Sequence, residues 1–105
     1  MNRAFVLLFI VLVPATCAAA EPSGEAVFNR WCVHCHGTEA AMPGRMRLEW
    51  NHGKARSVLA ERNDLDPAYV RQTVRHGRSE MPSFRITEIS EAELNALINY
   101  LTAKP

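Results

Sequence analysis

Five consecutive residues, Cys32-Val33-His34-Cys35-His36, constrain this chain more than any other part of its sequence. Two cysteines three positions apart, followed at once by a histidine, form the C-x-x-C-H pattern of covalent attachment to a c-type haem. On one helical turn residues i and i+3 share a face, so both thiols can reach the two vinyl edges of one porphyrin while the histidine points at its iron. The sequence therefore predicts one covalently bound haem c, attached through Cys32 and Cys35, with His36 as an axial iron ligand.

Three other interpretations of the same residues stay open. A zinc site needs four ligands, but His52 and His76 are isolated and no second Cys/His pair has suitable spacing. A thioredoxin-like redox pair is expected in a βαβ setting, which this sequence does not indicate. A structural disulfide between Cys32 and Cys35 is geometrically possible but leaves His36 unexplained. We therefore favour haem attachment.

The first 20 residues are typical of a removable secretory signal peptide. Arg3 supplies a positive start, residues 4–13 are an unbroken apolar run, and three alanines at 18–20 precede Glu21. An apolar run of 10 residues is far short of the roughly 20 needed to cross a bilayer as a helix. We expect residues 1–20 to be removed, residues 21–105 to form one domain, and the product to reach the bacterial periplasm without a membrane span.

Removal of that leader leaves a chain with balanced charge and only two cysteines. Arg3 is the only charged residue lost, so the 12 basic residues fall to 11, which equals the number of acidic residues. A near-neutral chain lacks the basic character of nucleic-acid-binding proteins, so we expect no nucleic-acid partner. A domain this small rarely gains enough stability from its hydrophobic core alone, so fastening by a metal, a disulfide or a cofactor is expected.

Helix signals mark three segments, and no segment alternates like a strand over more than a few residues. Asp66 as N-cap and Pro67 at the first helical position begin a helix that ends before Gly77. Ser90 and Glu93 form a capping box at the start of the last helix. With their caps, the three helices are expected over about 23–35, 66–77 and 90–101. Residues 37–65 are expected to be irregular, with one or two helical turns around 55–62, so the predicted fold class is all-α.

With this haem motif and these helix signals, the sequence resembles the class I cytochrome c family over nearly all of residues 21–105. The residues that carry the resemblance are Gly24, Phe28, Cys32, Cys35, His36, Gly77, Met81, Pro82, Ser83, Phe84 and Tyr100. The resemblance implies a cytochrome c fold with three to four helices wrapped around one covalently attached haem. It also implies a close crossing of the first and last helices, which Gly24, Phe28 and Tyr100 permit.

The same resemblance assigns the second axial ligand to Met81. Met42 and Met46 compete in principle, but Met42 follows His36 by only six residues and is therefore expected on the histidine side of the ring. The alternatives are a core role for Met81 or a histidine ligand, either His52 or His76. The resemblance also suggests that the backbone carbonyl of Pro43 accepts a hydrogen bond from the His36 ring.

The resemblance implies electron transfer rather than catalysis, and no catalytic residue is predicted. An imidazole and a thioether leave no open position on the iron and raise its potential relative to two histidines. The chain is similar to the small cytochrome subunits of periplasmic dehydrogenases, such as that of p-cresol methylhydroxylase. A flavoprotein or quinoprotein dehydrogenase is the expected donor, and an oxidase or another cytochrome the expected acceptor. A peroxidase-like enzyme and a gas-binding haem sensor are the alternatives.

One cluster of basic residues is not accounted for by haem binding. Arg71, Arg75 and Arg78 recur at near-helical spacing and suggest either a docking patch for an acidic partner or an ordinary solvated face.

Overall fold

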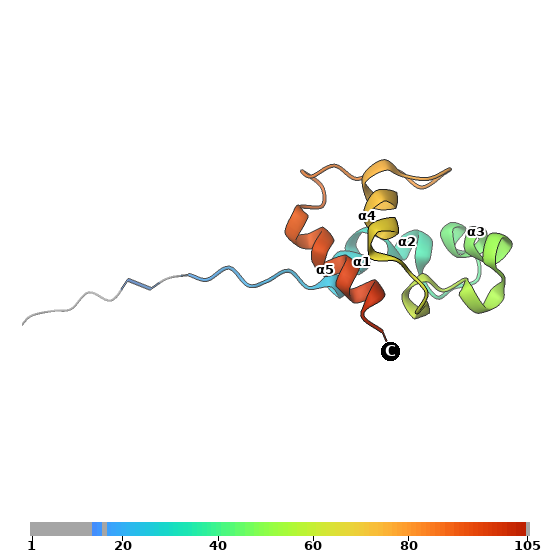
Figure 1. The fold of residues 1–105 in the computed structure, drawn as a ribbon, viewed down its shortest axis with the longest axis horizontal. Helices are drawn as coiled ribbons and strands as arrows, with labels where there is room; N and C mark the ends of the chain where they lie inside the picture. Colours follow the sequence, from blue (N-terminus) through green and yellow to red (C-terminus); the bar gives the residue numbers. More distant parts are fainter. Residues whose placement is uncertain (1–13, 16, 105) are drawn as a thin grey trace, which may run out of the picture.

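The computed structural model describes residues 14–15 and 17–104 as a set of short helices joined by loops (Figure 1). Within this range there are five α-helices, two 3-10 helices and no strand, which confirms the all-α prediction for the described residues. In order they are α1 (Gly24–Trp31), α2 (Val33–His36), α3 (Pro43–His52), η1 (Lys54–Arg56), η2 (Leu59–Glu61), α4 (Pro67–His76) and α5 (Glu91–Thr102). None of these helices is long and apolar enough to cross a membrane.

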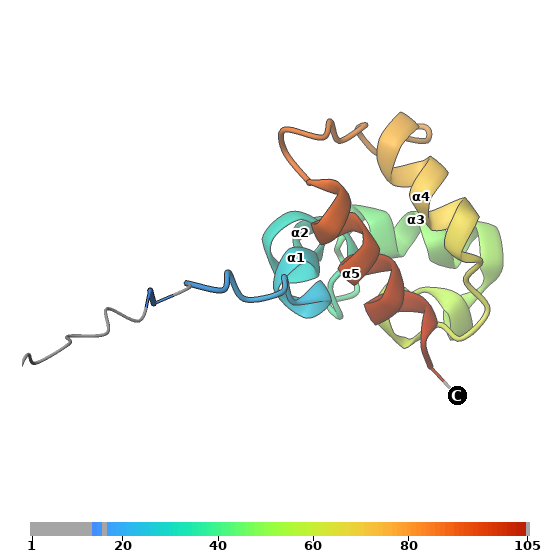
Figure 2. The same ribbon diagram turned by 60° about the vertical axis from the view of Figure 1, so that its left-hand side comes forward.

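The helices α1 and α5 cross in contact with each other, and Figures 1 and 2 both show them side by side. A Cβ atom on Gly24 would overlap the carbonyl oxygen of Ala96 and come within 2.6 Å of the Tyr100 Cβ. The Phe28 and Tyr100 rings pack with their centroids 5.8 Å apart. The close crossing implied by the resemblance is therefore confirmed, and it depends on the missing side chain at Gly24.

The hydrophobic core extends from this crossing to α4. Its buried members are Val27, Phe28, Val70, Val74, Ile89, Leu94, Leu97, Ile98 and Leu101. The α5 residues recur every three or four positions, so one face of that helix is covered.

The caps predicted for α4 and α5 are present. The Asp66 side chain accepts a hydrogen bond from the backbone N–H of Tyr69, and Pro67 is the first residue of α4. Ser90 and Glu93 make both hydrogen bonds of a capping box at the start of α5. These two helix starts are encoded locally, which is why the sequence predicts them correctly.

Two predictions about the first half of the domain were wrong in detail. The expected helix over 23–35 is interrupted at Cys32, which ends α1 and precedes the single turn of α2. The region 37–65 contains α3, a ten-residue helix that the sequence pattern does not indicate. Pro43 suggests a break in helical structure, but it is the first residue of α3. An N–H at that position would have no partner within the helix, so proline is tolerated there. These additions explain why the structure has more helices than the three to four expected.

The predicted leader falls largely outside the described residues. Of residues 1–20, only 14–15 and 17–20 are described, and they are exposed and belong to no helix. The removal of residues 1–20 therefore remains a prediction.

Candidate haem site

The interruption between α1 and α2 brings both cysteines and the histidine onto one turn of backbone. The Cys32 amide donates to the Phe28 carbonyl at 2.8 Å and so completes α1. The Cys32 carbonyl accepts from the amides of Cys35 and His36 at 3.1 and 2.8 Å. The C-x-x-C-H segment is therefore one compact helical turn, as the spacing predicts.

The two thiols differ in environment. Cys32 packs against the core, while Cys35 is exposed. Burial, together with the neighbouring Cys35, raises the pKa of the Cys32 thiol to about 11. A protonated thiol is a poor redox nucleophile at neutral pH.

The geometry gives little support to the other interpretations of these cysteines. Cys32 and Cys35 are both free thiols in the structure rather than a disulfide. No group of three or more His, Cys, Asp or Glu side chains in the described part of the chain is arranged to hold a metal ion. The zinc interpretation therefore has no ligand set there.

The His36 ring is half-buried and lies against the start of α3. A Cβ on Gly44 would come within 2.7 Å of the ring Cε1 and 2.8 Å of Nδ1, so the backbone of α3 contacts the imidazole directly. Burial lowers the pKa of His36 and favours the neutral ring, which is the form that binds metals.

The hydrogen bond expected between Pro43 and the His36 ring is not formed. His36 Nδ1 is buried and has no hydrogen-bond partner among the described residues. Pro43 is the first residue of α3, and a carbonyl at that position points along the helix axis toward the amide four residues later. The helix missed by sequence reasoning therefore also explains why this prediction was wrong.

Met81 lies in the loop between α4 and α5, and this loop begins with a sharp turn. Gly77 has φ of +71°, and a Cβ there would come within 2.6 Å of the Met81 carbonyl oxygen. The backbones of Arg78 and Met81 exchange two hydrogen bonds of 3.1 and 2.9 Å. Ser79 lies within this turn and has φ of +52°, in the left-handed region. These contacts fix the backbone of Met81 relative to the end of α4.

Among the methionines that the structure describes, Met81 packs against the hydrophobic core, and it is half-buried. Met46 is 56% exposed on α3, and Met42 precedes α3 on the segment that follows His36. The alternative histidines, His52 and His76, are exposed at the C-terminal ends of α3 and α4.

One contact connects the Met81 loop with the segment that carries the cysteines and His36, and a second connects it with α3. The rings of Trp31, next to Cys32, and Phe84, three residues after Met81, meet edge-on with centroids 5.7 Å apart. On α3, the Arg47 guanidinium binds the Glu80 carboxylate at 2.6 Å. The structure therefore holds the two segments with the predicted ligands against one another.

We expect the Arg47–Glu80 ion pair to contribute little to stability, because both side chains are more than half exposed. Arg47→Ala and Glu80→Gln should each shift the melting temperature by no more than about 3 °C. The coupling between them, measured in a double-mutant cycle, should disappear in high salt. A coupling that persists at high salt would contradict this expectation.

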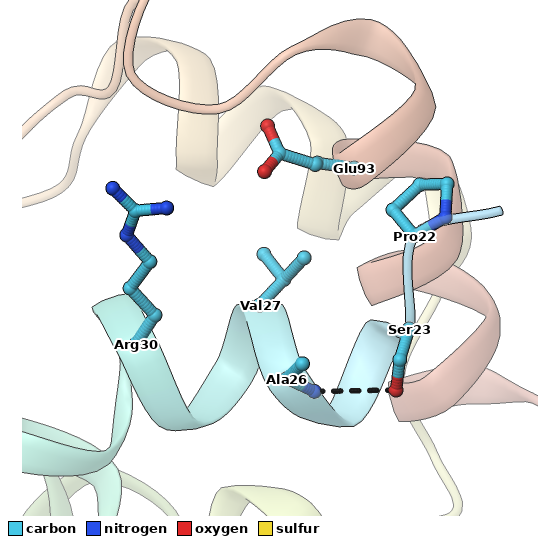
Figure 3. A pocket seen from close by; sticks show the side chains of 6 residues that line it. All are labelled: Pro22, Ser23, Ala26, Val27, Arg30 and Glu93. Atoms are coloured by element: carbon cyan, nitrogen blue, oxygen red, sulfur yellow. Dashed lines mark hydrogen bonds between the residues drawn. The ribbon is translucent and has the colours of Figure 1, made fainter. Parts of the chain in front are cut away.

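Two shallow hollows lie elsewhere on the surface. One, of about 500 Å³, is lined by Met46, Glu49 and Trp50 of α3. The other, of about 210 Å³, is lined by Pro22, Ser23, Ala26, Val27, Arg30 and Glu93 (Figure 3). In this second hollow the Ser23 hydroxyl caps α1, as the dashed line shows, and Glu93 belongs to the capping box of α5. Neither hollow includes the predicted haem residues.

The basic cluster does not form a free patch. Arg71 and Arg75 both bind the carboxylate of Glu91 at 2.7 Å, and the Arg78 guanidinium lies over the Tyr69 ring. The Arg75 side chain is only 16% exposed. Arg75 is thus mostly buried within the domain, whereas Arg71 and Arg78 keep part of their surface exposed, so a docking role for these two stays a prediction.

The chain is similar in sequence to known proteins. Residues 19–101 match the family model for cytochrome c oxidase, cbb3-type, subunit III. The cytochrome c subunit of 4-cresol dehydrogenase (hydroxylating) from Pseudomonas putida is 28% identical, with 95% of this chain and 79% of that protein aligned. Dihydro-heme d1 dehydrogenase from Pseudomonas aeruginosa is 32% identical, but the match covers 90% of this chain and only 18% of that protein.

A solved structure is similar as well. It is a crystal structure of p-cresol methylhydroxylase with substrate bound, and one of its chains matches with a TM-score of 0.59 and 27% identity. The match covers 81% of this chain and 96% of that one. The two chains therefore share a fold over most of their length.

Proposed function

The chain belongs to the cytochrome c family described as cytochrome c oxidase, cbb3-type, subunit III, and from this premise we propose that it carries single electrons from a periplasmic dehydrogenase to the respiratory chain. Family membership and the similar cytochrome subunits support a covalently attached haem c and a role in electron transfer. The donor, the acceptor and the periplasmic location are the proposed parts.

In this proposal Cys32 and Cys35 attach the haem, and His36 and Met81 are its axial ligands. The haem supplies a one-electron iron couple. The single observation that carries the assignment is the contact between the two ligand-bearing segments through Trp31 and Phe84. If His36 and Met81 both bound the iron, no position would be left for a substrate, so the chain is proposed to be a carrier and not itself an enzyme.

The proposed residues fit a haem by their chemistry. The half-buried imidazole of His36 favours its neutral form, and the Met81 thioether packs against an apolar core. The partly buried Cys32 is held by a hydrogen-bonded turn that fixes its spacing to Cys35.

The donor is proposed from the relatives. The 4-cresol dehydrogenase cytochrome subunit aligns over nearly the whole chain, which supports a dehydrogenase that binds this cytochrome as its electron acceptor. If the cytochrome is a permanent subunit, the two should copurify from cells in which both are produced at natural levels. If it is a free shuttle, the contact should be small and sensitive to salt.

The ligand assignment is tested by replacing Met81 with alanine in protein exported through a haem c maturation pathway. The ferric protein should lose its sulfur-to-iron absorption band, and the midpoint potential should fall by on the order of 0.1 V, because a thioether raises the potential. Met46→Ala is the matched control, since Met46 is exposed on α3 and should leave both readouts unchanged. A Met81→Ala protein with an unaltered band would remove Met81 from the site, and a colourless wild-type product would overturn the proposal.

A further inference from the structure

Arg75, in the last turn of α4, makes three hydrogen bonds with a side chain that is mostly buried. Its Nη1 donates to the carbonyl oxygens of Phe84 at 3.1 Å and Ile89 at 2.8 Å. Its Nη2 donates to the Glu91 carboxylate at 2.7 Å. One guanidinium therefore joins the end of α4, two points on the following loop and the first turn of α5.

These bonds are placed where the loop carrying Met81 returns to the core. Residues 77–90 connect α4 to α5, and the loop backbone is anchored at one further point, where the Phe84 amide donates to the Val74 carbonyl at 2.8 Å. Val74 lies in the last turn of α4, so its carbonyl lacks an intrahelical partner and Phe84 supplies one. Arg75 binds the other side of the same peptide segment, at the carbonyl of Phe84.

The fork geometry of arginine suits this task. A guanidinium presents several N–H donors in a fixed plane, whereas an ammonium is a point charge. Without Arg75, the partly buried carbonyls of Phe84 and Ile89 would each lose this donor, and Ile89 is fully buried. Leaving such groups unpaired is costly, so the loop would shift toward solvent to regain hydrogen bonds.

Arg71, one turn earlier on α4, offers a natural comparison. It binds the same Glu91 carboxylate at 2.7 Å and also the side chain of Asn95, so both of its partners belong to α5. Arg71 ties α4 to α5 without a hydrogen bond to the loop.

We propose that Arg75 is a positioning residue, which clamps the segment from Phe84 to Ile89 and thereby holds Met81 at the iron. This inference rests on the proposed role of Met81 as axial ligand. It assigns to Arg75 a function that a merely structural ion pair with Glu91 would not have, because the two loop carbonyls are bound by the same guanidinium.

The test compares Arg75→Leu with Arg71→Leu in the haem-loaded protein, by two readouts. The first is hydrogen exchange at the Phe84 amide, which should be at least about tenfold faster in Arg75→Leu and unchanged in Arg71→Leu. The second is the concentration of added imidazole that abolishes half of the sulfur-to-iron band. It should fall by about tenfold in Arg75→Leu, because an unclamped loop opens more readily, and stay at the wild-type value in Arg71→Leu.

Arg75→Lys keeps the charge and the aliphatic stem but not the fork, so it should give intermediate values, and it serves in place of Arg75→Leu if that variant does not fold. Equal effects from Arg71→Leu and Arg75→Leu would overturn the inference, as would faster exchange at Phe84 with no change in imidazole sensitivity. A wild-type band that survives Met81→Ala is a different result, which overturns the ligand assignment itself. A band lost in Met81→Ala but insensitive to Arg75 variants overturns only the inference.

Discussion

Replacing Gly24 with alanine should destabilise the domain, although the same change in an open helix would stabilise it. Alanine is favoured over glycine within helices by up to about 1 kcal/mol. Here the added Cβ would overlap the Ala96 carbonyl oxygen and come within 2.6 Å of Tyr100, so α1 and α5 must separate. Overpacking of this kind costs about 1–3 kcal/mol, and a larger side chain such as valine should exceed that range.

For a domain of this size such a loss lowers the melting temperature by roughly 5–20 °C, which thermal unfolding of the haem-loaded protein would measure. Ala26→Gly is the matched control, because Ala26 is exposed on the same helix and reports the helix preference alone. The control should cost about 1 kcal/mol or less. A Gly24→Ala protein as stable as the wild type would show that the two helices do not need their close crossing.

Replacing Gly44 with alanine should disturb the histidine side of the site while leaving the attachment intact. The new Cβ would come within 2.7 Å of the Cys35 carbonyl oxygen and of His36 Cε1, so either α3 or the imidazole must move. Since Cys32 and Cys35 are unchanged, we expect a coloured protein with covalent haem. Its reduced form should bind added carbon monoxide, which a fully ligated iron resists.

Asn51→Ala is the control for this effect, because Asn51 is exposed on the same helix. It should leave the spectrum and the response to carbon monoxide as in the wild type. A Gly44→Ala protein with wild-type behaviour would mean that the His36 ring does not depend on its contact with α3.

The sequence predicts the parts of this structure that are encoded locally. The caps of α4 and α5 use short-range side-chain to backbone bonds, so Asp66 and Ser90 reveal them directly. The close crossing of the first and last helices is expected from the family resemblance, which includes the small Gly24 and the aromatic Phe28 and Tyr100. The C-x-x-C-H turn likewise follows from its own spacing.

What the sequence does not reveal depends on contacts between distant segments. The α3 helix has no side-chain cap and little amphipathic pattern, so Pro43 and Gly44 suggest a break instead. The loss of the expected Pro43 hydrogen bond follows from that error. In the sequence, Arg75 looks like one of three surface arginines. Only the folded chain brings the carbonyl oxygens of Phe84 and Ile89 within hydrogen-bond distance of its guanidinium.

Arg75 binds the loop through the backbone carbonyl oxygens of Phe84 and Ile89, not through their side chains. Any amino acid presents the same carbonyl, so the bonds made by Arg75 place no demand on the side chains of Arg85 and Ile86. Both residues lie between Phe84 and Ile89 with their side chains exposed. Substitutions at these two positions can therefore change the chemistry of an exposed surface without removing the hydrogen bonds that support the loop.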